Sequence, residues 1–231
     1  MGTLTRGKEV GTLTRHAFVS LRFPGMLARM KKGALGLVLF CSLWGFARQH
    51  PEPKFFLPVP LIRQSTEYSC GPAALLAVLA YYGISDFNET DLMTKAKTTE
   101  QGGTDITDLT QTAEGVGLKA RWQEHATLDQ LRASLSAGHP VIVAAQAWPP
   151  GIAPKSFSAV WEDGHYLVVV GMDSEFIYFM DPSHLGSRGY WTLDSFLERW
   201  HDTDGKEERL HHLAIFFQGT PQPPSAWLPI P

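Results

Sequence analysis

The stretch that decides the fold is Gln64-Ser65-Thr66-Glu67-Tyr68-Ser69-Cys70-Gly71-Pro72-Ala73-Ala74, which continues through an apolar segment to Tyr81-Tyr82-Gly83. It predicts a helix that begins near Cys70, because Pro72 suits a first turn and Gly83 suits a left-handed stop. Residues 73–80 are apolar on every face, which is typical of a helix buried on all sides. A thiol at the start of such a helix would lie at the positive end of the helix dipole, which favours the thiolate.

The composition limits what the chain can be. Its 231 residues allow one good-sized domain and an appendage. The net charge is −3 and the basic residues after Cys70 are scattered, so we expect no nucleic-acid partner. Of the two cysteines, Cys41 lies in an apolar run, which leaves Cys70 as a free thiol. A lone cysteine is more often inert packing, so its role depends on the partners that the chain supplies.

The N-terminal region predicts export. A basic group at residues 29–32 precedes an uncharged run at 33–46, with small residues at Gly45 and Ala47. We interpret residues 30–47 as a signal peptide, with an uncleaved membrane anchor over 33–47 as the alternative. The expected location is therefore periplasmic or otherwise extracytoplasmic. Residues 1–29 carry no fold signal, and we hypothesise a biological start at Met26 or Met30, because a signal sequence normally opens a chain.

The remaining chain predicts an α+β domain over residues 57–218, after a proline-rich linker (48–56) and before a proline-rich tail (219–231). Further helices are expected at 91–97, 104–116, 127–137 and 193–200, and strands at 118–122, 140–145, 165–171, 176–180 and 213–217. Helices come mostly first and strands mostly last, at hairpin spacing. This order favours a mainly antiparallel sheet packed against the helix that carries Cys70.

A nucleophilic cysteine needs a base, and the base needs a group that orients it. Among nine histidines, His165 differs because Asp163-Gly164 leads it directly into an apolar strand. A hairpin that turns near residues 173–174 would bring His165 to the neighbourhood of Asp181, where Pro182 ends the strand. From the hairpin alone, a surface histidine and a turn aspartate that never meet are equally expected.

The whole pattern resembles the C39 family of papain-like cysteine peptidases. The elements that carry the resemblance occur in the family's order: Gln64…Cys70-Gly71-Pro72-Ala73-Ala74, Gly102-Gly103-Thr104, Gly138-His139-Pro140-Val141-Ile142-Val143, Gly164-His165-Tyr166 and Asp181-Pro182. The resemblance implies a papain-like fold, with Cys70 as nucleophile, His165 as general base and acid, Asp181 orienting His165, and Gln64 as oxyanion donor. It also implies a peptide or protein substrate and no cofactor or metal.

Several interpretations remain open. The chain has no multi-span region and no phosphate-binding loop, so it resembles the stand-alone branch rather than transporter-fused members. The same residues could serve an acyl transferase, or the domain could bind peptides without turnover. Residues 201–205 predict a solvated turn rather than a calcium loop, and His211-His212 lacks the spacing of a zinc site. Four tryptophans are expected either in a cleft or in the core: Trp148, Trp161, Trp191 and Trp200.

Overall fold

A computed structural model of the chain describes residues 53, 55–148, 156–184, 188–203 and 208–222. These residues belong to the unit Arg48–Pro231. In this described part of the chain, no helix is long and apolar enough to cross a bilayer. The predicted signal or anchor at residues 30–47 lies outside the described residues.

Within the described residues, six strands form one antiparallel sheet in the order β1-β8-β2-β3-β4-β5. The strands are β1 (Lys119–Gln123), β2 (Val141–Gln146), β3 (Gly164–Met172), β4 (Phe176–Met180), β5 (Gly189–Thr192) and β8 (Ala214–Gln218). Every residue of β2 is buried, which explains the apolar run Val141 to Ala145 that precedes Gln146 in this strand. The predicted α+β class with an antiparallel sheet is therefore confirmed, whereas β5 was not expected.

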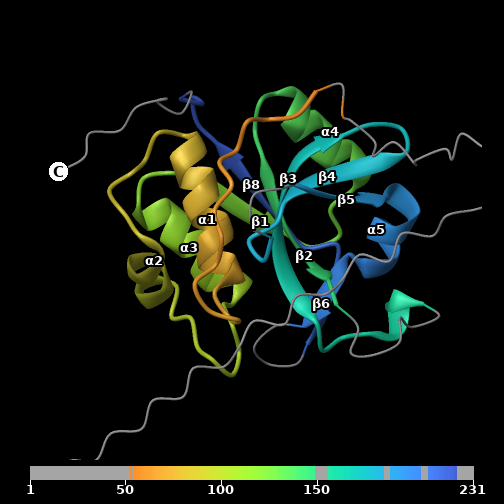
Figure 1. Cartoon of the computed structure of the whole chain (residues 1–231), viewed down its shortest axis with the longest axis horizontal. Helices are drawn as coiled ribbons and strands as arrows, with labels where there is room; N and C mark the ends of the chain where they lie inside the picture. Colours follow the sequence, from red (N-terminus) through yellow and green to blue (C-terminus); the bar gives the residue numbers. More distant parts are fainter. Residues whose placement is uncertain (1–52, 54, 149–155, 185–187, 204–207, 223–231) are drawn as a thin grey trace, which may run out of the picture. The chain divides into compact units, whose positions relative to one another are not determined.

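The helix that carries Cys70 is α1 (Cys70–Tyr81), and it packs on β3. Figure 1 shows α2 (Glu89–Lys95) and α3 (Ile106–Gly115) beside α1, on the side of the sheet opposite α5 (Leu193–Arg199). The helix α4 (Leu128–Ser136) contacts β2 and β3. As predicted, α1 is buried on nearly every face, and Gly83 follows it at a φ of 76°.

The β3–β4 hairpin has a register that the sequence predicted only approximately. Pairing runs through Val168↔Met180 and Val169↔Phe179, and a β-bulge then shifts it by one residue before Gly171. Asp181 is the first residue after β4, so it lies past the end of the paired segment. His165 and Asp181 are thus at the same end of the hairpin without being directly opposite each other.

A second, two-stranded sheet corrects one prediction. Residues 201–203 were expected in a solvated turn, but they form β6 (His201–Thr203), which pairs with β7 (Arg209–His211). His201 is buried and Asp202 is partly buried, because β6 packs against β2. Strands of three residues are too short to produce a period-2 pattern, so the polar composition dominated the prediction. Residues 204–207 lie outside the described part of the chain.

Candidate active site

Cys70 is the first residue of α1 and is a half-buried free thiol. The turn before it is closed by Ser69, whose Oγ accepts hydrogen bonds from the backbone N (3.1 Å) and Oγ1 (2.8 Å) of Thr66. A Cβ at Gly71 would lie 3.2 Å from side-chain carbons of Thr104 and Tyr166. Glycine at this position therefore lets the start of α1 approach its neighbours closely, which places Cys70 against β3.

His165 and Asp181 form a buried pair. Nε2 of His165 donates to Oδ1 of Asp181 at 2.8 Å, and the two residues are 2% and 9% exposed. The same carboxylate oxygen accepts from the backbone N (2.9 Å) and Oγ (2.7 Å) of Ser183. These bonds hold Asp181 in one orientation, so the imidazole is oriented with its other edge toward the thiol.

The charges of this pair support each other. Burial lowers the pKa of His165, but hydrogen bonds to Asp181 and Cys70 and the charges of both groups outweigh burial and raise that pKa to about 9. Burial raises the pKa of Asp181, but its bonds to His165 and Ser183 outweigh burial and hold that pKa well below its usual range. At neutral pH the pair is therefore an imidazolium and a carboxylate, and the Cys70 thiol interacts with that imidazolium.

Gln64 is attached to the same end of the hairpin. Its backbone N–H donates to the carbonyl of Pro182 at 2.8 Å, directly beside Asp181. Its side-chain Nε2 donates to the carbonyl of Thr66 at 2.8 Å, in the turn that leads to Cys70. That bond uses one of the two amide hydrogens, which leaves the second for another acceptor. Buried Oε1 has no hydrogen-bond partner among the described residues.

A cleft of about 460 Å³ opens beside Cys70. Its walls come from the turn before α1, the segment that contains Gly102-Gly103, the start of β3, and the β6–β7 sheet. Trp161 lines this cleft, and Trp148 lies against His165 with 4.6 Å between ring centroids. Trp191 and Trp200 instead pack with Phe179 and Phe196 in the core. The structure thus divides the four tryptophans between site and core.

Three polar residues of this region were not predicted. His184 places Nδ1 2.8 Å from Oδ2 of Asp181, on the carboxylate oxygen that does not contact His165. The Gln146 amide accepts from the backbone N of Asp163 (2.9 Å) and donates to the carbonyl of His201 (3.1 Å). Asp202 lines the cleft. Only His184 left a signal in the sequence, because it follows Asp181 by three residues in a turn that Pro182 begins.

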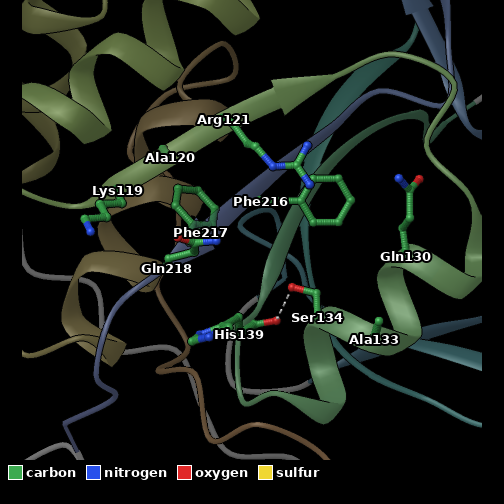
Figure 2. Close-up of a pocket in the computed structure, with 10 residues that line it drawn as sticks. All are labelled: Lys119, Ala120, Arg121, Gln130, Ala133, Ser134, His139, Phe216, Phe217 and Gln218. Atoms are coloured by element: carbon green, nitrogen blue, oxygen red, sulfur yellow. Dashed lines mark hydrogen bonds between the residues drawn. The ribbon is translucent and has the colours of Figure 1, made fainter.

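A second cavity, of about 320 Å³, lies between β1, β8 and α4 (Figure 2). Its one hydroxyl side chain, Ser134, donates to the backbone carbonyl of His139 at 3.1 Å. Arg121 stacks over the ring of Phe216 at 4.8 Å. Among the described residues that line this cavity, none pairs a nucleophile with a side-chain base, so the chemistry of the molecule points to the cleft beside Cys70.

Comparison with solved structures finds several that are similar to this chain. A protein from Bacillus anthracis classed as a C39-like peptidase aligns with a TM-score of 0.56 at 18% identity, over 74% of this chain and 100% of its own. The peptidase domain of Streptococcus ComA, a bi-functional ABC transporter of a quorum-sensing pathway, aligns at 0.49 with 22% identity, over 70% and 99%. A double glycine motif protease from an AMS/PCAT transporter, solved with its leader peptide, aligns at 0.49 with 17% identity, over 74% and 100%.

Among curated proteins, none matches the chain significantly. The profile of the Peptidase_C39 like family matches residues 56–208, which is well over half of the chain. This range contains Gln64, Cys70, His165 and Asp181. The resemblance predicted from the sequence motifs is therefore confirmed: the chain belongs to the Peptidase_C39 like family.

Proposed function

We propose that the protein is a cysteine peptidase or amidase that forms an acyl-enzyme on Cys70. The observation that carries this proposal is the buried His165–Asp181 pair at 2.8 Å, whose imidazole also interacts with Cys70 at the start of α1. This arrangement combines a nucleophile, a proton carrier and an orienting carboxylate. Membership of the peptidase family supports a peptide bond as the target.

In the proposed reaction, Cys70 reacts as a thiolate paired with the His165 imidazolium, and this thiolate attacks the scissile carbonyl carbon. The second amide hydrogen of Gln64 and the backbone N–H of Cys70 donate to the oxygen that becomes negative. The His165 imidazolium gives its proton to the leaving amine as the C–N bond breaks. A water molecule then gives a proton to neutral His165 and attacks the thioester, which releases the acid and restores the Cys70 thiolate beside the imidazolium. Asp181 holds the imidazole in the required orientation throughout.

The direct test is a peptide-library digest by the wild-type protein and by Cys70→Ala. We expect cleavage products only from the wild type. In parallel, alkylation of Cys70 by iodoacetamide should persist at pH 6–7 in the wild type and fall about tenfold or more in His165→Ala, because the imidazolium that stabilises the thiolate is lost. His125→Ala is the matched control, since that histidine has a side chain 74% exposed. If the wild type cleaves no peptide and His165→Ala is alkylated as fast as the wild type, the peptidase proposal is wrong. A domain that binds peptides without turnover would then be favoured.

We also propose that the chain is exported and acts outside the cytoplasm, on the basis of the sequence pattern of residues 30–47. Fractionation of the native host, followed by N-terminal peptide mapping, tests this location. A mature N-terminus close to residue 48 would indicate signal cleavage, whereas a membrane-bound chain that retains residues 33–47 would indicate an anchor. Recovery of unprocessed chain in the cytoplasm would contradict export, and peptides from residues 1–25 would contradict a start at Met26.

A further inference from the structure

The cleft beside Cys70 has one sign of charge. Among the described residues that line the cleft, none is a lysine, arginine or histidine. Four carry carboxylates: Glu67, Asp105, Glu162 and Asp202. Asp105 also caps α3, and Glu162 accepts a hydrogen bond from the backbone N of Trp161. Arg209 stacks on the ring of Trp161 at 4.7 Å but is not among the lining residues. The cleft thus attracts positive charge and repels anions.

Asp202 is a cleft carboxylate of which only one oxygen has hydrogen-bond donors among the described residues. Its Oδ1 accepts from the backbone N of Thr203 (2.8 Å) and from Nε2 of Gln146 (3.3 Å). Among the described residues, no side chain or backbone group donates to Oδ2. Burial raises the pKa of Asp202 to about 7, since these hydrogen bonds and His165 offset only part of the desolvation. Asp202 is partly buried and lines the cleft, so a cation that enters the cleft can pair with the carboxylate oxygen that has no donor among the described residues.

Asp202 is also fixed close to the reacting groups. Its carboxylate packs on the α-carbon of Gly164, the residue before His165, and a Cβ at Gly164 would clash with it. The surrounding walls include aromatic Tyr68 and Trp161 and apolar Leu210. Aliphatic and aromatic walls that lead to a carboxylate suit a long side chain with a cationic end.

We propose that this cleft binds a cationic group of the peptide substrate, an ammonium or guanidinium, with Asp202 as its counter-ion. The proposal rests on the proposed function in one respect, namely that a peptide occupies this cleft. Because Asp202 lies beside Gly164, the cationic group would be close in sequence to the bond that Cys70 attacks. The chemistry is shared by a lysine or arginine side chain and by a free N-terminal amine.

Binding to the full-length Cys70→Ala variant tests the proposal without requiring turnover. The probes are N-acetylated peptide amides in matched pairs. At each position in turn, one pair compares lysine with uncharged norleucine and a second pair compares arginine with uncharged citrulline. A parallel set with a free N-terminus and no internal cation distinguishes the amine from the side chain. Isothermal titration should show about tenfold or stronger binding of one cationic peptide than of its neutral partner, with the preference reduced by high salt.

The added variant Asp202→Asn should bring that ratio of affinities close to one. Asp129→Asn is the matched control, because it removes the same charge from a side chain 93% exposed on α4, and it should leave the ratio unchanged. If Asp202→Asn does not fold, Glu162→Gln at an exposed cleft position should still lower the ratio. Equal binding of charged and neutral peptides, no binding by any cationic peptide, or an unchanged ratio in Asp202→Asn would overturn the proposal.

The same peptides separate this proposal from the proposed function. A wild-type protein that binds cationic peptides selectively but cleaves none would contradict the peptidase function and retain the cleft specificity. A protein that cleaves peptides without any preference for a cation would support the peptidase function and contradict the cleft specificity.

Discussion

His184 hydrogen-bonds to Asp181 on the oxygen opposite the one that binds His165, with both distances at 2.8 Å. A carboxylate that shares its charge between two donors interacts less strongly with each of them. We predict that His184→Ala raises the pKa of His165 and moves the alkaline limit of kcat/KM upward by a few tenths of a pH unit. Because the His184 side chain is 57% exposed, kcat/KM at neutral pH should change by no more than about fivefold.

The control for this prediction is His125→Ala, an exposed histidine next to Glu124. It should leave the pH–rate profile unchanged. An alkaline limit that stays in place or moves downward in His184→Ala would show that His184 does not influence the pair.

Asp181→Asn should shift the same limit in the opposite direction. Burial lowers the pKa of His165, and the hydrogen bond to Asp181 is the largest single contribution that raises this pKa to about 9. The proposed reaction needs a protonated imidazole to deliver a proton to the leaving amine, so activity is present below this pKa and declines as the pH rises through it. Without the negative charge, the alkaline limit should move to lower pH and kcat should fall by about a hundredfold or more. A profile that keeps its limit near pH 9 would contradict the assigned role.

The contact between Gly164 and Asp202 predicts a coupling of stabilities. Gly164→Ala would force a methyl group into the Asp202 carboxylate, and we expect the free energy of unfolding to fall by about 1–3 kcal/mol. In the double variant Gly164→Ala/Asp202→Ala the clash is absent, so the loss should be clearly smaller than the sum of the two single losses. Urea unfolding of the wild type, the two single variants and the double variant measures these free energies and gives the coupling between the two positions.

Gly115→Ala is the matched control, because a Cβ there has no neighbour within 4 Å. It should be neutral or slightly stabilising, since alanine is favoured over glycine in the last turn of α3. Additive losses at Gly164 and Asp202 would contradict direct contact between the two residues.

Gln64→Ala tests the proposed oxyanion donor. Loss of one donor from an oxyanion site typically lowers kcat by about 10²–10³, and we expect a loss of that size. Alkylation of Cys70 by iodoacetamide forms no oxyanion, so its rate should remain close to that of the wild type. The backbone bond from Gln64 to Pro182 is independent of the side chain, so the fold should be retained. A parallel fall in alkylation and kcat would instead indicate a displaced Cys70.

The sequence was sufficient to predict the elements whose signals are local. The apolar stretch after Cys70 predicted α1 because a helix buried on all sides must be apolar on all sides. Asn88 and Thr127 close capping boxes at the starts of α2 and α4, so the beginnings of these helices are also set by neighbouring residues. The β3–β4 hairpin followed from two apolar runs separated by a turn, and it brought His165 to the region of Asp181.

The tertiary structure alone decided which polar residues of distant segments meet. Asp202 looked like part of a solvated turn, because three-residue strands have no periodic pattern, yet the packing of β6 against β2 brings it beside Gly164. The tryptophans could not be divided between cleft and core, since both environments select the same large apolar ring. Local sequence thus determined the helices, the hairpin and the position of Cys70 at the start of α1. The charge and walls of the cleft depend instead on long-range packing that no local pattern encodes.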